Sequence, residues 1–241
     1  MHRPARVALM ATLAATLLLL ALAWGLPAGA LAGFTAEDGP MEMLSAALWV
    51  AMGAIALWRA RPGSPTVWAY ALTGVVLAVR ETGIPRAWVP SGARLLKLAY
   101  YRDAAVPALE RAVTGAIVAV LLVALIGAVV ATARYLWQRR GWRQPDGQVL
   151  LLAGVVLVVS QLCEHGGSWQ MRLGLPPAGE GAKLVLLVLE EGLEAVTAAL
   201  ACAGVWLAAG WPRQARIRAA RGRATGPSRA DAPAGVRRGL F

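Results

Sequence analysis

The chain has 241 residues, of which 58% are hydrophobic and 15% are charged, and its formal net charge is +11. This composition is too apolar for a soluble domain of ordinary surface, and it excludes an intrinsically disordered chain. Two cysteines are too few for a disulfide-stapled secreted domain. The basic residues do not indicate a DNA-binding domain, because they would need a water-soluble scaffold to present them. The composition therefore indicates a membrane protein.

Six apolar runs follow one another along the chain, and a bilayer core about 30 Å thick needs roughly 20 such residues per helix. They cover residues 7–24, 41–58, 66–81, 112–133, 148–164 and 184–211. Pro40 and Pro65 lie where helices are expected to begin, and Pro212 is expected to end the last one. The sequence thus predicts an all-α, polytopic membrane helix bundle of about six transmembrane helices within residues 1–211.

The first run has two interpretations. Arg3 and Arg6 precede it and small residues follow at 28–32, which is also the pattern of a cleavable signal peptide. The apolar stretch of a signal peptide usually has about 7 to 15 residues, whereas residues 7–24 form a longer run. We therefore favour a retained helix. Cleavage would leave five spans with the same orientation.

Basic residues are distributed unevenly between the two sides of the predicted bundle. With the N-terminus in the cytoplasm, 16 of the 24 Lys and Arg residues fall on the cytoplasmic side. Of the 13 acidic residues, only Asp146 and Asp231 fall there. Cytoplasmic loops of membrane proteins carry an excess of Lys and Arg, so both termini are predicted to be cytoplasmic.

Two segments outside the runs have a distinct composition. The outer segment 82–110 contains Leu95, Leu96 and Leu98 among basic residues, and its part from 91 to 103 suits a short amphipathic helix, with an irregular loop as the alternative. The last segment, 212–241, is rich in Arg, Ala, Gly and Pro, which predicts a disordered cytoplasmic tail attracted to anionic lipid. It lacks the aromatic or structured interleaving of a nucleic-acid-binding segment, so no nucleic-acid partner is expected.

Carboxylates at membrane depth are the most informative feature of the sequence. Glu190, Glu191 and Glu194 lie in the outer third of the last run, and their spacing places them within about 100° on one helix face. An ionisable group at this depth costs several kcal/mol unless it faces a cavity, water or a partner. Three adjacent carboxylates cannot all stay ionised there, so we expect a bound proton, a cation or an ion-pair network.

Further polar residues lie at the same predicted level, at the outer ends of the other runs. If the bundle closes, these ends surround an outward-facing polar pocket, and Arg80 or Arg111 is the expected partner of Glu190 or Glu194. The candidate pocket comprises Glu42, Arg80, Glu81, Glu164, His165, Glu190, Glu191 and Glu194. Glu37, Asp38 and Glu110 are interpreted instead as charges at helix ends or at the membrane interface.

The candidate pocket has the ligand chemistry for a metal ion. Carboxylate oxygens favour divalent cations such as Ca²⁺, Mg²⁺ or Mn²⁺, and His165 together with Glu190, Glu191 and Glu194 would admit Zn²⁺ or Fe. No phosphate-binding glycine loop and no histidine pair for haem is present, so neither a nucleotide nor haem is expected.

Several short motifs resemble those of uncharacterised bacterial multi-pass inner-membrane proteins. They are Glu-Asp-Gly-Pro-Met-Glu at 37–42, Arg-Glu at 80–81, the paired tyrosines within 98–103, and Leu-Glu-Glu-Gly-Leu-Glu at 189–194. The resemblance covers most of residues 30–210. It implies a location in the bacterial inner membrane and suggests that these acidic residues belong to one set; it carries no activity.

Three functions remain open on the sequence. The first is a small transporter or accessory subunit whose carboxylates bind a cation or a proton. The second is a membrane-embedded metal-dependent or acid/base lipid hydrolase or transferase, with the glutamates as ligands or general base, His165 as acid and Arg80 on a phosphate. The third is a structural role, in which the acids pair within the bundle or at a homo- or hetero-oligomer interface.

Overall fold

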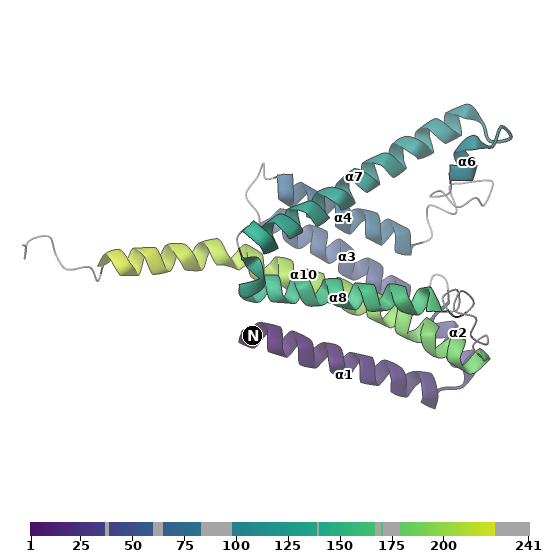
Figure 1. Ribbon diagram of the computed structural model, residues 1–241, viewed down its shortest axis with the longest axis horizontal. Coiled ribbons are helices and arrows are strands. Elements are labelled where there is room, and N and C mark those ends of the chain that lie inside the picture. Colours follow the sequence, from purple (N-terminus) through teal and green to yellow (C-terminus); the bar gives the residue numbers. More distant parts are fainter. Residues whose placement is uncertain are drawn as a thin grey trace, which may run out of the picture. The chain divides into compact units, whose positions relative to one another are not determined.

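The computed structural model describes residues 1–36, 39–59, 65–82, 98–138, 140–166, 170 and 179–224. Within these residues all regular structure is helical, which confirms the predicted fold class at this level (Figure 1). The helices are α1 Arg3–Gly25, α2 Ala28–Phe34, α3 Pro40–Arg59, α4 Pro65–Glu81, α6 Leu98–Arg102, α7 Ala108–Gln138, the 3₁₀ helix η1 Gly141–Arg143, α8 Pro145–Glu164 and α10 Glu180–Ala224. The chain divides into two compact units, Met1–Ala209 and Gly210–Phe241.

Four helices are long and apolar enough to cross a membrane. These are α1, α3, α7 and α8, each with at least 18 residues. Large apolar side chains such as Leu17, Val123 and Leu162 are exposed on them, which a water-facing surface rarely shows in such numbers. The helices therefore suggest a membrane protein. For α4, which has 17 residues, and for α10, spanning stays a prediction.

Proline and glycine set the helix boundaries as expected. Pro40 and Pro65 are the first residues of α3 and α4, and Pro145 is the first of α8. Proline suits this position because its missing N–H would have no partner in the first turn. Gly25 is the last residue of α1, and Leu26 after it is extended.

The end of α10 differs from the prediction. The helix continues through Pro212 to Ala224, so the expected helix end at Pro212 is wrong, while the disordered cytoplasmic tail stays a prediction. Proline removes one backbone hydrogen bond but does not stop a helix when good helix formers follow, and residues 213–224 are mostly Arg and Ala. Residues 225–241 lie outside the described part of the chain.

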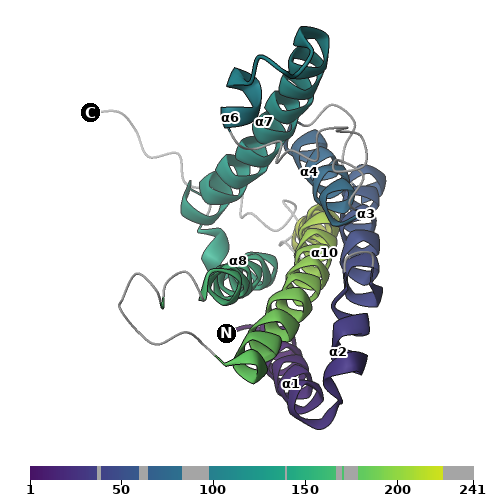
Figure 2. The ribbon, with the colours of Figure 1, turned by 90° about the vertical axis from the view of Figure 1, so that its right-hand side faces the viewer.

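Helix α10 lies at the centre of the unit Met1–Ala209 (Figure 2). Its residues enter three buried clusters, one with α3 and α4, one with α1 and α8, and one with α1, α2 and α3. Small residues of α10 allow close approach in this packing. A Cβ on Gly192 would collide with Leu19 of α1, and a Cβ on Gly204 would lie 2.6 Å from Cδ2 of Leu150 in α8.

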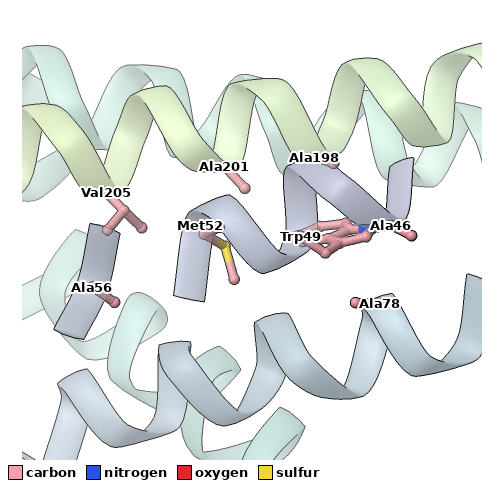
Figure 3. Packing of buried hydrophobic residues seen from close by; sticks show 8 residues of the cluster. All are labelled: Ala46, Trp49, Met52, Ala56, Ala78, Ala198, Ala201 and Val205. Atoms are coloured by element: carbon pink, nitrogen blue, oxygen red, sulfur yellow. The ribbon is translucent and has the colours of Figure 1, made fainter. Parts of the chain in front are cut away.

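Contacts along the helices fix their directions. In Figure 3, Ala198, Ala201 and Val205 of α10 follow Trp49, Met52 and Ala56 of α3 in the same order, so these two helices run parallel.

The α3–α4 crossing is antiparallel and very close. A Cβ on Gly53 would lie 3.1 Å from the carbonyl oxygen of Ala71, and one on Gly74 would lie 2.5 Å from that of Trp49. Helices α4 and α7 are also antiparallel, because Thr73 Oγ1 donates to the Ala124 carbonyl while Tyr70 bonds with Thr132. Direction therefore alternates from α3 to α4 to α7.

The remaining helices follow the same alternation. Helix α10 is antiparallel to α1, since Leu19 meets Gly192 and Ala5 clusters with Leu200. It is also antiparallel to α8, because Ser160 meets Glu190 while Leu150 lies against Gly204. We call the end that holds Glu42, Glu81, Glu164 and Glu194 the glutamate end, and the opposite end, which holds His2, Arg140 and Asp146, the arginine end.

Candidate functional site

The eight predicted pocket residues come from four helices that meet at the glutamate end. Glu42 lies in the first turn of α3, and the Arg80-Glu81 pair ends α4. Glu164 is the last residue of α8 and His165 follows it, while the three glutamates at 190, 191 and 194 lie in α10. Each is within electrostatic range of at least one other. Glu42 interacts with Glu81 and Glu191, while Glu164 and His165 interact with Glu190. The antiparallel packing of α4 and α8 against α10 brings these chain-distant groups to one end.

An ion pair between Arg80 and Glu194 is at the centre of the site. Nη2 of Arg80 lies 3.0 Å from Oε1 and 3.4 Å from Oε2 of Glu194. The two partners differ in environment, since the side chain of Glu194 is 7% exposed and that of Arg80 is 53% exposed. The expected pairing of Arg80 with an α10 glutamate is thus present, with the carboxylate inside the bundle and the guanidinium at its edge.

Glu81 brings a second buried carboxylate to the same guanidinium. Its side chain is 5% exposed, and Oε1 lies 3.9 Å from Nη1 of Arg80. Glu81 also interacts electrostatically with Glu194 and Glu42. Two buried carboxylates therefore share one cation, with a third acid nearby. Burying an ionised carboxylate without its own counter-charge is costly, so this arrangement favours a neutral, protonated state for one member.

Two polar residues of α8 complete the contacts and were missed by the sequence reasoning. Nε2 of Gln161 donates to Oε1 of Glu194 over 3.3 Å, and Oγ of Ser160 donates to the Glu190 carbonyl over 3.2 Å. The signal was visible as adjacent polar side chains in an otherwise apolar span. Each polar group at membrane depth needs a partner, which makes such residues candidates whenever carboxylates lie at the same level.

Ser45 of α3 was also missed. It is 1% exposed, and its hydroxyl is buried without a hydrogen-bond partner among the described residues. Ser45 lies one turn before Trp49, and Glu194 lies one turn before Ala198, which packs in the same cluster as Trp49. Ser45 and Glu194 therefore occupy the same level of the parallel α3–α10 pair.

The remaining predicted residues lie towards the surface. Glu190 and Glu191 are half-buried, so the three α10 glutamates differ in environment even though they lie on neighbouring positions. His165 is exposed, with Nδ1 3.0 Å from the Gln161 carbonyl oxygen and 3.8 Å from a carboxylate oxygen of Glu164. Glu164 and His165 thus form the outer edge of the site.

Other expectations for this site stay predictions or concern residues outside the described part of the chain. In the described part of the chain, no three His, Cys, Asp or Glu side chains are placed to hold a metal ion, including Glu190, Glu191, Glu194 and His165. Arg111 donates to the backbone carbonyl of Tyr101 instead of to an α10 glutamate, because it starts α7, which packs on α4 and α6. Glu37 and Asp38, and most of segment 91–103, lie outside the described residues; α6 forms the end of that segment.

Comparisons with known proteins give no further guide: no family model, curated protein or solved structure matches the chain. The chemistry of the site therefore has to be judged from its own groups. They comprise buried carboxylates, one half-exposed guanidinium, an amide and hydroxyls. Such a set can bind and release a proton or hold helices together.

Proposed function

We propose that this chain is a multi-pass bacterial inner-membrane protein that binds a proton or a small cation among carboxylates on the side facing away from the cytoplasm. The observation that carries the proposal is the burial of Glu81 and Glu194 around the single guanidinium of Arg80. Their charges do not balance when both acids are ionised. Holding one proton removes the excess charge at the least cost in a medium of low dielectric constant.

Of the two ligands, a proton is favoured over a metal ion. The absence of a three-ligand group among the described residues argues against a divalent cation there. A proton needs only one carboxylate and an acceptor nearby, which the Glu81–Glu194 neighbourhood supplies. The buried hydroxyl of Ser45 lies at the same level and can donate a hydrogen bond to a carboxylate or to a bound water.

The topology supports six crossings with both termini in the cytoplasm. Helices α1, α3, α4, α7, α8 and α10 alternate in direction, as six consecutive crossings require. Arg3, Arg140 and Arg143 lie at one end and most of the described acids lie at the other. The positive-inside rule places the arginine end in the cytoplasm and the glutamate end outside.

Binding is favoured over conduction. Beyond Glu194, the polar side chains of α10 up to residue 208 are Thr197 and Cys202. Both donate to backbone carbonyls, Thr197 to Leu193 within the helix and Cys202 to Leu48 of α3. They leave no polar route along this helix towards the arginine end, so an accessory or sensing role fits better than transport through α10.

Infrared spectroscopy of the purified protein tests the proposal. At neutral pH the wild type should show the C=O stretching band of a protonated, buried carboxylic acid, and Glu81→Gln or Glu194→Gln should remove it. The exposed Glu180, which pairs with Lys183 at the surface, provides the control, because Glu180→Gln should leave the band unchanged. A spectrum without this band in the wild type would refute proton binding.

The direct Arg80–Glu194 bond also supports a second candidate function, a structural ion pair that locks α4 to α10. Under this alternative the protonation state is incidental, and the glutamates matter only for stability. Proton uptake that survives both glutamine variants while their stability falls would favour the structural role. For the alternative of a lipid hydrolase or transferase, the exposed position of His165 and the lack of a three-ligand group in the described residues offer no support.

A further inference from the structure

We propose that the arginine end binds the headgroup of an anionic phospholipid, at a site formed by the start of α1 and the turn between α7 and α8. This site is separate from the carboxylates at the glutamate end. It does not depend on their function, but only on placement of the helices in a membrane. It is also distinct from the basic C-terminal segment for which the sequence predicts lipid attraction.

His2 fastens the start of α1 to the turn before α8. Its backbone N–H donates to Oε1 of Gln148 over 3.0 Å, and its ring Nε2 lies 2.8 Å from the carbonyl oxygen of Arg143. One turn further, Ala5 is buried against Val149. The basic residues at the start of α1 are therefore held beside those of the turn, although they are about 140 positions apart in the sequence.

Residues 140–147 of the turn are closely packed. A Cβ on Gly141 would lie 2.6 Å from the ring of Tyr135, and one on Gly147 would collide with the Gly141 carbonyl. The hydroxyl of Tyr135 donates to Oδ2 of Asp146 over 2.6 Å, and Asp146 is 4% exposed. These contacts support the backbone that carries Arg140 and Arg143.

The positive charges on this support are not compensated by protein carboxylates. Arg3, Arg6, Arg140 and Arg143 are all exposed. In the described part of this end the carboxylate is Asp146, which is buried under Tyr135, and none of the described ion pairs involves these four arginines. An external anion can therefore approach them without displacing a protein carboxylate, although Nε of Arg6 donates to the backbone carbonyl of Met1.

Arg140 occupies a backbone conformation that is unfavourable for its residue type. Its φ of 51° and ψ of 38° place it in the left-handed region, where glycine or asparagine is usual. Among the described residues it is the one non-glycine residue with positive φ. A charged side chain kept at a position that glycine would fill more easily points to a role for the guanidinium itself.

Exposed tryptophans place this surface at the depth of lipid headgroups. Trp137 is 86% exposed and Trp142 is 46% exposed, and the guanidinium of Arg143 lies 4.5 Å from the ring centroid of Trp142. Indole rings are enriched at the membrane interface. A guanidinium group binds a phosphate through two parallel N–H···O hydrogen bonds. The predicted side is cytoplasmic, where the leaflet is rich in anionic lipid.

Lipid titration of the purified full-length chain in detergent micelles tests the proposal. The readout is the melting temperature during addition of phosphatidylglycerol, phosphatidylcholine or inorganic phosphate. Phosphatidylglycerol should stabilise the wild type, while the other two should not. The midpoint of this titration should rise about fivefold for Arg140→Gly and for Arg143→Gln. Without lipid, Arg140→Gly should be at least as stable as the wild type, because glycine suits the left-handed conformation.

Arg102→Gln, which removes one exposed charge from α6, is the matched control and should leave the midpoint unchanged. The basic C-terminal segment is present in all variants and contributes equally. Three results would overturn the proposal: unchanged midpoints in both arginine variants, an equal rise in the Arg102 control, or equal stabilisation by inorganic phosphate alone.

Discussion

At the scale of single residues, Arg80 and Glu194 illustrate how burial decides the consequence of a substitution. The carboxylate is inside the bundle and the guanidinium is half-exposed. Removing the exposed partner strands a buried charge, whereas removing the buried partner leaves a charge that water can reach. The two single substitutions should therefore differ in cost although they break the same hydrogen bonds.

We expect Arg80→Gln to lower the free energy of unfolding by about 2 kcal/mol and Glu194→Gln by about 1 kcal/mol. The double variant should cost less than the sum of the two, because a neutral residue 194 no longer needs the guanidinium, while buried Glu81 still loses its contact with Arg80. Denaturant unfolding in micelles measures all three. Strictly additive costs would show that the two side chains are not coupled, and would contradict the observed ion pair.

The acids of the site could be predicted from the sequence because a charge in an apolar run is conspicuous. Which of them is buried could not be predicted. Glu190, Glu191 and Glu194 are equivalent in the sequence pattern, but only Glu194 is buried on Arg80. Which of them faces the bundle interior depends on the rotation of α10 against α4 and α8, a relation between helices to which contacts such as Gly204 with Leu150 contribute.

At the scale of elements, the α3–α4 crossing depends on glycine for its close approach. Gly53 and Gly74 each face the backbone of the other helix. Small residues allow such approach in membrane proteins, where packing and not the hydrophobic effect drives helix association. A backbone neighbour cannot move aside as a flexible side chain can, so added volume at these positions should be felt strongly.

Gly74→Ala should lower the free energy of unfolding by about 2 kcal/mol, because its new Cβ would lie 2.5 Å from the Trp49 carbonyl oxygen. Gly154 in α8 is the matched control, since a Cβ there meets nothing within 4 Å. Gly154→Ala should be neutral or should stabilise the helix by up to about 1 kcal/mol. Thermal unfolding in micelles measures the stability of both variants. Equal stability of Gly74→Ala and Gly154→Ala would contradict a close contact between the backbones of α3 and α4.

At the scale of the whole molecule, the alternation of helix directions and the separation of charges support the proposed topology of six crossings. Six crossings would place Gln138, at the end of α7, in the cytoplasm and Glu180, at the start of α10, outside. Both positions are exposed, so reagents can reach them. The topology can thus be tested without knowledge of the activity.

In a background with Cys163→Ser and Cys202→Ser, we expect Glu180→Cys to react with a membrane-impermeant maleimide in intact bacterial cells. Gln138→Cys should react only after the membrane is permeabilised. The cysteine-free background is the control for nonspecific labelling. Labelling of both positions from the same side would contradict an odd number of crossings between them.

The sequence by itself determined the helical fold, the apolar spans and the uneven distribution of charge. These properties depend on local composition, because each span needs only its own run of apolar residues and its own proline or glycine boundaries. It also drew attention to the acids, but it misplaced the end of α10, since the effect of one proline depends on the helix around it.

Only the tertiary structure decided which groups meet. The partnership of Arg80 with Glu194, the contact of Gln161, the level of Ser45 and the joining of His2 to the α7–α8 turn all depend on register between distant segments. The register between two helices depends on how their small residues fit together, as along α10, α3 and α8. It is a property of the pair, so the hydropathy of a single helix does not encode it.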